Sequence, residues 1–206
     1  MLKKGLILCF VLVGVTLWAD VQERMTFAAK TGKLSEVKQL IKEGAKVNGK
    51  TRYGFAALHV VGSLKVAKYL IKKGADVNIK NDGDGSTPLH TVSNLAIAKY
   101  LIKKGAKVNA KDSFNATPLH TVSDLAIAKY LIKKGAQVNA KDDDGNTPMH
   151  SVVASAVALD DKPIPFVKLF LKHGGNINAR NKKGKTVLGV LRREDLAKEL
   201  KKLGAK

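Results

Sequence analysis

The chain has 206 residues, of which 45% are hydrophobic and only 5% aromatic, so its core must be built mainly from aliphatic side chains. This composition favours packed helices over an aromatic-rich β-sandwich, and the length suits one compact domain. The formal net charge of +20 fits either a polyanionic partner or an ordinary lysine-rich surface, and the positions of the lysines have to decide between them.

Residues 1–19 have the layout of a secretory signal peptide. Two early lysines are followed by an uncharged apolar run of 14 residues, Gly5 to Trp18, and then by the small residue Ala19. The run is shorter than the roughly 20 residues that a membrane-spanning helix needs. We therefore expect cleavage before Asp20 and a periplasmic or secreted protein, with an uncleaved membrane anchor as the alternative. Cleavage would remove the only cysteine, Cys9, so the mature chain would carry no disulfide.

Internal repeats dominate the rest of the sequence. Residues 87–112 and 117–142 agree at 24 of 26 positions, and weaker copies flank this pair at 55–78 and 147–178. The copies share a histidine at intervals of 31, 30 and 30 residues, namely His59, His90, His120 and His150. A fixed period of this length predicts a stack of repeats in which each repeat touches only its neighbours.

Each repeat predicts two short helices and a hairpin loop. Pro88, Pro118 and Pro148 fall at the first position of the first helix, where a missing N–H costs nothing. Asn94 and Asp124 are suited to cap the second helix. The apolar residues of that second helix recur at helical spacing on one face.

The second helix should provide most of the core. We expect Leu101 and Leu131 to be buried between neighbouring repeats, and Gly105 and Gly135 to end the helix in the left-handed conformation. The extended segment that follows should direct two valines inward, Val108 and Val138.

These motifs resemble the ankyrin-repeat family. TPLH occurs at 87–90 and 117–120 and TPMH at 147–150, and successive units close with GADVN, GAKVN, GAQVN and GGNIN. The resemblance covers about residues 20–206 and implies an all-α ankyrin-repeat solenoid of stacked helix-turn-helix units with hairpin loops. After the expected signal peptide (1–19), it divides the chain into an N-terminal capping repeat (20–48), repeats at 49–78, 79–109 and 110–139, a repeat with an insertion (140–178) and a C-terminal capping repeat (179–206).

Two departures from the family pattern stand out. The family has six steps from the motif histidine to the next turn glycine, whereas His59 and Gly62 are three apart, so the first helix should be nearly one turn shorter in the early repeats. The shorter helix thins the wall of the groove that the family uses for binding. The repeat at 140–178 is long, with extra residues around 158–165 before a helix expected to begin at Pro165.

Several features invite a catalytic or metal-site interpretation and fail its requirements. Stacked helices lie about 8–10 Å apart, whereas zinc ligands must each lie about 2.0–2.1 Å from the ion, so the four histidines should not converge. The resemblance implies instead that each histidine bonds loop backbone within its own repeat. The aspartate-rich turns at 82–85 and 142–145 lack the register of a calcium loop. We find no nucleophile–base constellation and predict no enzyme activity, no cofactor and no small-molecule substrate.

The resemblance implies that a partner docks on the hairpin tips and the first-helix face. Tyr53, Phe55 and Phe114 are prominent there, because aromatic side chains dominate interface hot spots. The alternative is that one or two of these rings fold back onto the neighbouring repeat. The candidate partner-binding residues are Arg52, Tyr53, Phe55, Asp84, Ser113, Phe114, Asp143, Asp144 and Asn146.

The lysines recur on the second helices instead, as Lys103 and Lys104 and then Lys133 and Lys134. Such lysines are either a solvated face that suits the helix C-terminus or a basic ridge for an anionic envelope polymer, a lipid surface or nucleic acid. The leading prediction is a monomeric, exported protein-binding module, with an inhibitor or immunity protein as one variant. The alternative is a polyanion binder that uses the lysine ridge.

Overall fold

The computed structural model describes residues 21–155, 163–191 and 194–206, and every regular element within them is a helix. A single isolated antiparallel bridge joins Lys50 to Ala56. The chain divides into two units, one ending at Gly83 and the other beginning at Asp84.

The first unit holds a helix at residues 21–30, then α2 (Leu34–Lys42), the short 3₁₀ helix η1 (Ala57–His59) and α3 (Leu64–Lys72). Gly32, with φ of +76°, makes the turn between the first two helices. Met25, Leu40 and Leu70 are fully buried and form the centre of this unit.

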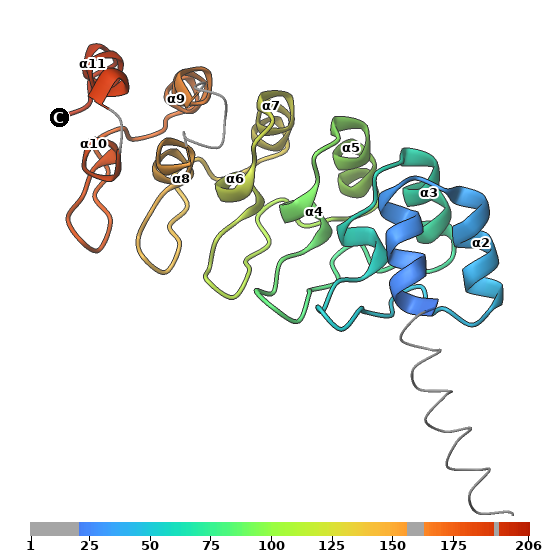
Figure 1. The fold of residues 1–206 in the computed structure, drawn as a ribbon. Coiled ribbons are helices and arrows are strands. Elements are labelled where there is room, and N and C mark those ends of the chain that lie inside the picture. Colours follow the sequence, from blue (N-terminus) through green and yellow to red (C-terminus); the bar gives the residue numbers. More distant parts are fainter. Residues whose placement is uncertain (1–20, 156–162, 192–193) are drawn as a thin grey trace, which may run out of the picture. The chain divides into compact units, whose positions relative to one another are not determined.

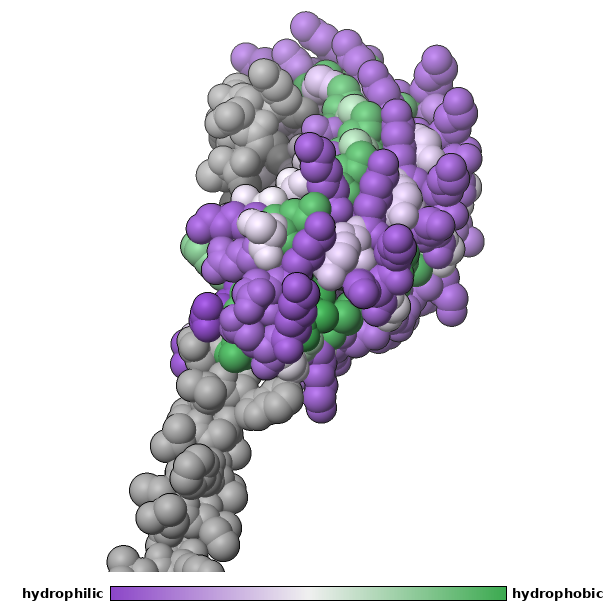
Figure 2. Space-filling model, turned by 90° about the vertical axis from the view of Figure 1, so that its right-hand side faces the viewer, coloured by the Kyte–Doolittle hydropathy of each residue, from purple (hydrophilic) through white to green (hydrophobic). Residues whose placement is uncertain are grey.

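The first helix exposes two charged residues, Arg24 and Lys30, together with Phe27. Figure 2 views the molecule from the side on which residues 21–30 and α2 lie in Figure 1, and hydrophilic residues cover most of that face. This distribution suits a capping repeat, which needs a polar outer face. Within the described residues, none of the helices has both the length and the apolar character needed to span a bilayer.

The second unit repeats a pair of helices along its length. Short helices form one row and longer helices form a second row beside it, with the hairpin loops on the far side of the short helices (Figure 1). The short helices are α4 (Pro88–Thr91), α6 (Pro118–Thr121), α8 (Pro148–Ala154) and α10 (Val187–Val190). The longer ones are α5 (Leu95–Lys103), α7 (Leu125–Lys133), α9 (Pro163–Lys172) and α11 (Glu194–Lys202).

Local sequence explains where these helices begin. Pro88 is the first residue of α4, as predicted, and prolines start α6 and α8 in the same way. The Asn94 side chain accepts hydrogen bonds from the Ala96 and Ile97 amides at 2.9 and 3.2 Å. The Asp124 side chain accepts one from the Ile127 amide at 2.8 Å. Both predicted caps are therefore confirmed.

The predicted core is confirmed as well. Leu101 and Leu131 are both 0% exposed. Gly105 and Gly135 end their helices with φ of +94° and +89°, as expected. The sequence also predicted that Val108 and Val138 point inward, but both are only half-buried.

Helix lengths also follow the sequence. The first helix of the repeat spans three residues in η1 and four in α4 and α6, against seven in α8.

The expectation that α9 begins at Pro165 was wrong by two residues, since α9 begins at Pro163. Both prolines fall within its first turn, where the backbone N–H has no helical partner to lose. The rest of the 158–165 insertion and the proposed signal peptide at 1–19 lie outside the described residues.

Candidate partner-binding surface

Backbone hydrogen bonds join each hairpin loop to the next. In the second unit, the Ser113 amide donates to the Asp84 carbonyl oxygen at 2.8 Å. Two equivalent bonds follow in that unit, from the Asp143 amide to the Phe114 carbonyl oxygen (2.9 Å) and from the Lys182 amide to the Asp144 carbonyl oxygen (2.8 Å). In the first unit, the Asp82 amide donates to the Gly54 carbonyl oxygen at 3.2 Å. The side chains at the tips are therefore held on an ordered backbone.

Phe114 is the exposed large hydrophobic residue among the described residues of the second unit. Its side chain is 61% exposed, while its amide donates to the Asp112 carboxylate at 2.8 Å. The same carboxylate oxygen accepts from the Ala116 amide at 2.9 Å, and Asn115 adopts a positive φ of 57° in the turn between them. A fixed backbone thus presents an unpacked ring to solvent, as the sequence predicted for this position.

Tyr53 occupies the corresponding tip in the first unit and is 64% exposed. The guanidinium carbon of Arg52 lies 4.9 Å from the centre of the Tyr53 ring. The Arg52 amide donates to a Glu23 carboxylate oxygen at 3.1 Å, and the Arg52 Nε atom lies 3.8 Å from the same oxygen. Both predicted residues lie at this tip, and Arg52 limits the freedom of the ring beside it.

Phe55, a third predicted binding residue, is half-buried rather than free at the tip. Its ring meets the His59 ring edge to face, with the two centres 5.9 Å apart. Phe55 therefore packs within its own repeat, and its assignment as a partner-binding residue is withdrawn. An apolar ring gains more from covering a buried histidine than from remaining in water.

Sequence reasoning missed Phe27, which lies on the helix at residues 21–30 and is 61% exposed. The adjacent Ala28 and Ala29 are both fully buried. Helical periodicity contained the signal, because a residue directly before two buried alanines on so short a helix is turned towards the opposite face.

Several of the predicted polar residues serve the loops themselves. The Asp143 carboxylate accepts a hydrogen bond from the side-chain nitrogen Nδ2 of Asn115 at 2.6 Å. Asn146 donates to the Asp142 carboxylate at 3.2 Å and accepts from the Asn181 side chain at 2.9 Å. These contacts between loops are sufficient to explain why positions 143 and 146 carry an aspartate and an asparagine, with no need for a binding partner.

The remaining predicted residues differ in their exposure. The Asp84 carboxylate accepts from the Ser86 amide at 3.0 Å and therefore closes its own turn. Ser113 and Asp144 are exposed, with their backbones joined to neighbouring loops. Their side chains are accordingly available to a partner in the second unit.

The long first helix of the fourth repeat borders a hollow that the sequence did not predict. The hollow has a volume of about 650 Å³ and is lined by α8, α10 and the two adjoining hairpins. Asp144 lies on one hairpin and Lys183 and Lys185 on the other, and Ser151 and Ser155 line the α8 side. Side chains of both charge signs thus border one groove on the first-helix face.

The motif histidines connect neighbouring repeats. The His120 Nδ1 atom accepts from the Thr117 amide at 3.0 Å, and its Nε2 atom lies 3.2 Å from the Asn146 carbonyl oxygen of the next repeat. The expected bond to backbone within the same repeat is thus present at Nδ1, and the contact of Nε2 with the next repeat was not predicted. Three others make the same contact with a following hairpin: His59 with Ile79, His90 with Ala116 and His150 with Lys185.

The protonation state of these rings follows from their surroundings. Burial lowers the pKa of His120 and of His150 below the ordinary value of 6.5, and the hydrogen bonds to backbone oppose that shift only in part. Both ring nitrogens of the neutral form are used, so neither is available to a ligand. Within the described residues, no group of three or more His, Cys, Asp or Glu side chains could hold a metal ion.

Paired helices joined by hydrogen-bonded hairpins define a helical repeat protein with its variable side chains at the loop tips. A family model for ankyrin repeats in three copies matches residues 17–81, 61–142 and 94–181, and the chain belongs to the ankyrin-repeat family. A comparison with curated proteins gives no match. Ankyrin repeats are generic protein–protein interaction modules, and the family is typically non-catalytic.

Proposed function

We propose that the chain binds a protein partner through its hairpin tips and its first-helix face. The observation that carries this proposal is the exposed Phe114 ring on a backbone that hydrogen bonds fix on both sides. A segment whose backbone is already ordered loses little conformational freedom when a partner covers it, so most of the burial of its aromatic side chain contributes to affinity. Tyr53 repeats the arrangement in the first unit.

Charge at the tips of the second unit adds selectivity. The hairpin at residues 142–146 presents two exposed carboxylates, Asp143 and Asp144, and the exposed lysines of the last hairpin include the pair Lys182 and Lys183. A partner that fits this surface carries cationic groups towards the first pair and anionic groups towards the second. Such complementarity raises the rate of association and disfavours partners of the wrong charge pattern.

The place of action is also part of the proposal. Residues 1–19 support export, and the mature chain would then meet its partner in a bacterial periplasm or outside the cell. In that setting, an inhibitor or immunity protein that covers an exported enzyme or toxin is one form the interaction would take. We propose that the mature chain acts as a monomer.

The competing function uses the second helices as a basic ridge for an anionic polymer, a lipid surface or nucleic acid. Two of the ridge lysines have a structural explanation, since Lys104 lies 5.8 Å from the centre of the Tyr100 ring and Lys134 lies 5.7 Å from that of Tyr130. This contact stabilises the helix surface without a partner. The exposed Phe114 ring has no such contact within the described residues, and its exposure favours protein binding.

Site-specific photo-crosslinking in the native host tests the proposal. A benzophenone amino acid replaces Phe114 in one variant and Lys133, on the ridge, in a matched variant. We expect a discrete protein adduct at position 114 and none at position 133. An adduct at position 133 alone, or crosslinking to polymer or lipid at that position, would instead identify the basic ridge as the binding surface.

A further inference from the structure

A lysine from each second helix packs on a tyrosine of the next. In the first unit, the Lys38 Nζ atom lies 5.6 Å from the centre of the Tyr69 ring. In the second unit, Lys99 on α5 lies 5.7 Å from the Tyr130 ring on α7, and Lys134 of α7 lies 5.7 Å from the same ring. The tyrosine thus fills the space between two adjacent second helices and is flanked by a lysine from each.

This arrangement stops at α9. When the turn glycines Gly135 and Gly174 are aligned, Leu169 takes the position of Tyr130 and His173 takes that of Lys134. Lys129 on α7, the counterpart of Lys99, therefore has no ring to pack on among the described residues. Its ammonium group borders a space that a tyrosine fills in the preceding repeat.

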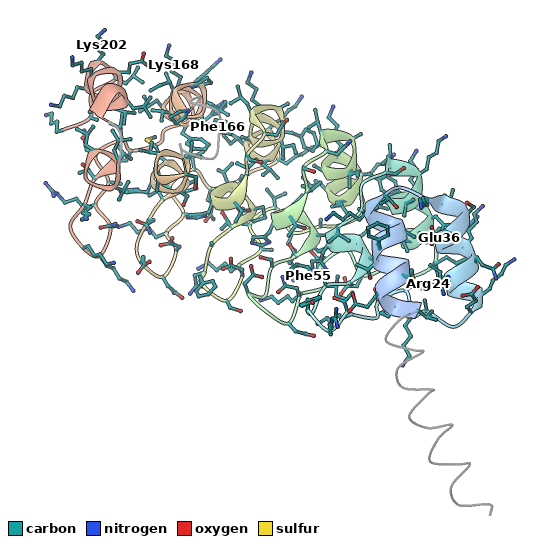
Figure 3. The ribbon with its side chains drawn as sticks, in the orientation of Figure 1. Arg24, Glu36, Phe55, Phe166, Lys168 and Lys202 are labelled. Atoms are coloured by element: carbon teal, nitrogen blue, oxygen red, sulfur yellow. The ribbon has the colours of Figure 1, made fainter. Side chains whose placement is uncertain are left out.

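A hollow of about 450 Å³ lies at this place, between α7 and α9. Lys129, Lys168, Lys172 and His173 border it, and Leu125, Pro165 and Leu169 supply its apolar lining. None of these residues is acidic, and the three lysines form no ion pair within the described residues. Figure 3 shows Lys168 on the side of α9 away from the hairpin loops, so the hollow does not belong to the partner-binding surface.

We propose that this hollow is a binding site for a phosphate group. Three ammonium groups and an imidazole can donate hydrogen bonds to several oxygens of one anion, and charge-assisted bonds of this kind are stronger than neutral ones. The apolar lining suits the organic part of a phosphate ester. Phosphate chemistry fits better than a single carboxylate, because a phosphate group places about two negative charges and three acceptor oxygens opposite the three lysines.

The decisive variant is Leu169→Tyr, which keeps every charge and fills the hollow with the ring that three other second helices carry. Amide NMR spectra of the purified chain are followed during titration with inorganic pyrophosphate at constant ionic strength. We expect saturable shifts confined to α7 and α9 in the parent chain and their loss in Leu169→Tyr. Lys168→Gln should weaken binding about tenfold, whereas Lys99→Gln, at the ring-filled position, should not change it.

A reciprocal variant strengthens the test. Tyr130→Leu should open a second hollow between α5 and α7 and add a second, weaker set of shifts there. If Leu169→Tyr shows the same pyrophosphate-induced shifts as the parent chain, or if the shifts spread evenly over all lysine-bearing helices, the proposed site is wrong. Pyrophosphate would then be attracted by the general positive charge of the surface. Thermal unfolding checks that each variant remains folded.

The source of the phosphate group is tested separately with vesicles that contain phosphatidic acid. Loss of vesicle binding in Leu169→Tyr would support a lipid headgroup as the ligand. Pyrophosphate binding without vesicle binding would support a soluble phosphate compound. The result is independent of partner binding at Phe114, which lies on the hairpin side and is unchanged in these variants.

Discussion

The Nε2 atom of His120 lies 3.2 Å from the carbonyl oxygen of Asn146, across the boundary between two repeats. The acceptor is a backbone carbonyl, so Nε2 must carry the proton, and Nδ1 is free to accept from the Thr117 amide at 3.0 Å. One neutral ring therefore fixes the start of its own first helix and the end of the following hairpin.

This geometry predicts that the fold loses stability in mild acid. The folded-state pKa of His120 and of His150 is lowered by burial, so the unfolded chain binds protons more readily. The stabilisation is complete above the unfolded value of 6.5 and declines as pH falls from there towards the folded-state pKa. Urea unfolding should give a smaller free energy at pH 5 than at pH 7.5. An NMR titration that places the pKa of His120 at or above 6.5 would contradict the prediction.

Leu131→Ala should destabilise the fold by about 2–5 kcal/mol, because the side chain is fully buried between repeats and leaves a cavity. Leu101→Ala should behave alike. Lys133→Ala, on the exposed face of the same helix, is the matched control and should change stability by less than about 0.5 kcal/mol. Chemical denaturation measures all three, and equal effects of Leu131→Ala and the control would disprove the repeat register.

Phe114→Ala and Tyr53→Ala should each weaken binding of the crosslinked partner by about 1 kcal/mol or more, roughly fivefold in Kd. Neither should alter thermal stability, because both rings are more than 60% exposed. Replacement of the ridge lysines with Gln, at Lys103, Lys104, Lys133 and Lys134, should leave affinity nearly unchanged at physiological salt. Calorimetric titration of the purified pair would show the reverse pattern if charge on the ridge drives binding.

Phe55→Ala should have the opposite profile to Phe114→Ala. Its ring packs edge to face on the buried His59, so its removal should cost about 0.5–1.5 kcal/mol of stability beyond the area term, with partner affinity preserved in the folded fraction. Parallel melting curves and binding titrations compare the two variants. If Phe55→Ala lowers partner affinity without lowering stability, Phe55 belongs to the binding surface after all.

Export predicts a mature chain that begins at or near Asp20 and shows no tryptophan fluorescence, because Trp18 would be removed. Intact-mass measurement of protein from the native host checks this directly. Retention of Met1 and Trp18 would rule out cleavage and leave the membrane-anchor alternative.

The repeat order, the caps at Asn94 and Asp124 and the buried leucines could be predicted from sequence because each depends on local spacing alone. The shorter first helices in the early repeats followed from the same counting. Such features need no knowledge of which residues meet across repeats.

Contacts between repeats were harder to predict. The reach of His120 to Asn146 and the packing of Phe55 on His59 depend on where a loop passes a neighbouring side chain. The hollow beside Leu169 results from a missing ring rather than a motif, and it emerges only when two packed helices are compared. Each of these depends on distances that sequence spacing does not specify.

The identity of α5 and α7, both LAIAKYLIK, has a consequence for the length of the protein. Removal of residues 95–124 would join Asn94 directly to Leu125 and regenerate the sequence SNLAIAKY that the chain already contains. The resulting chain would be one repeat shorter, would keep a native helix cap at the junction and would lack the tip that bears Phe114. The chain is thus modular: one repeat can be removed from its interaction surface, and the sequence at the new junction is one that already folds elsewhere in the protein.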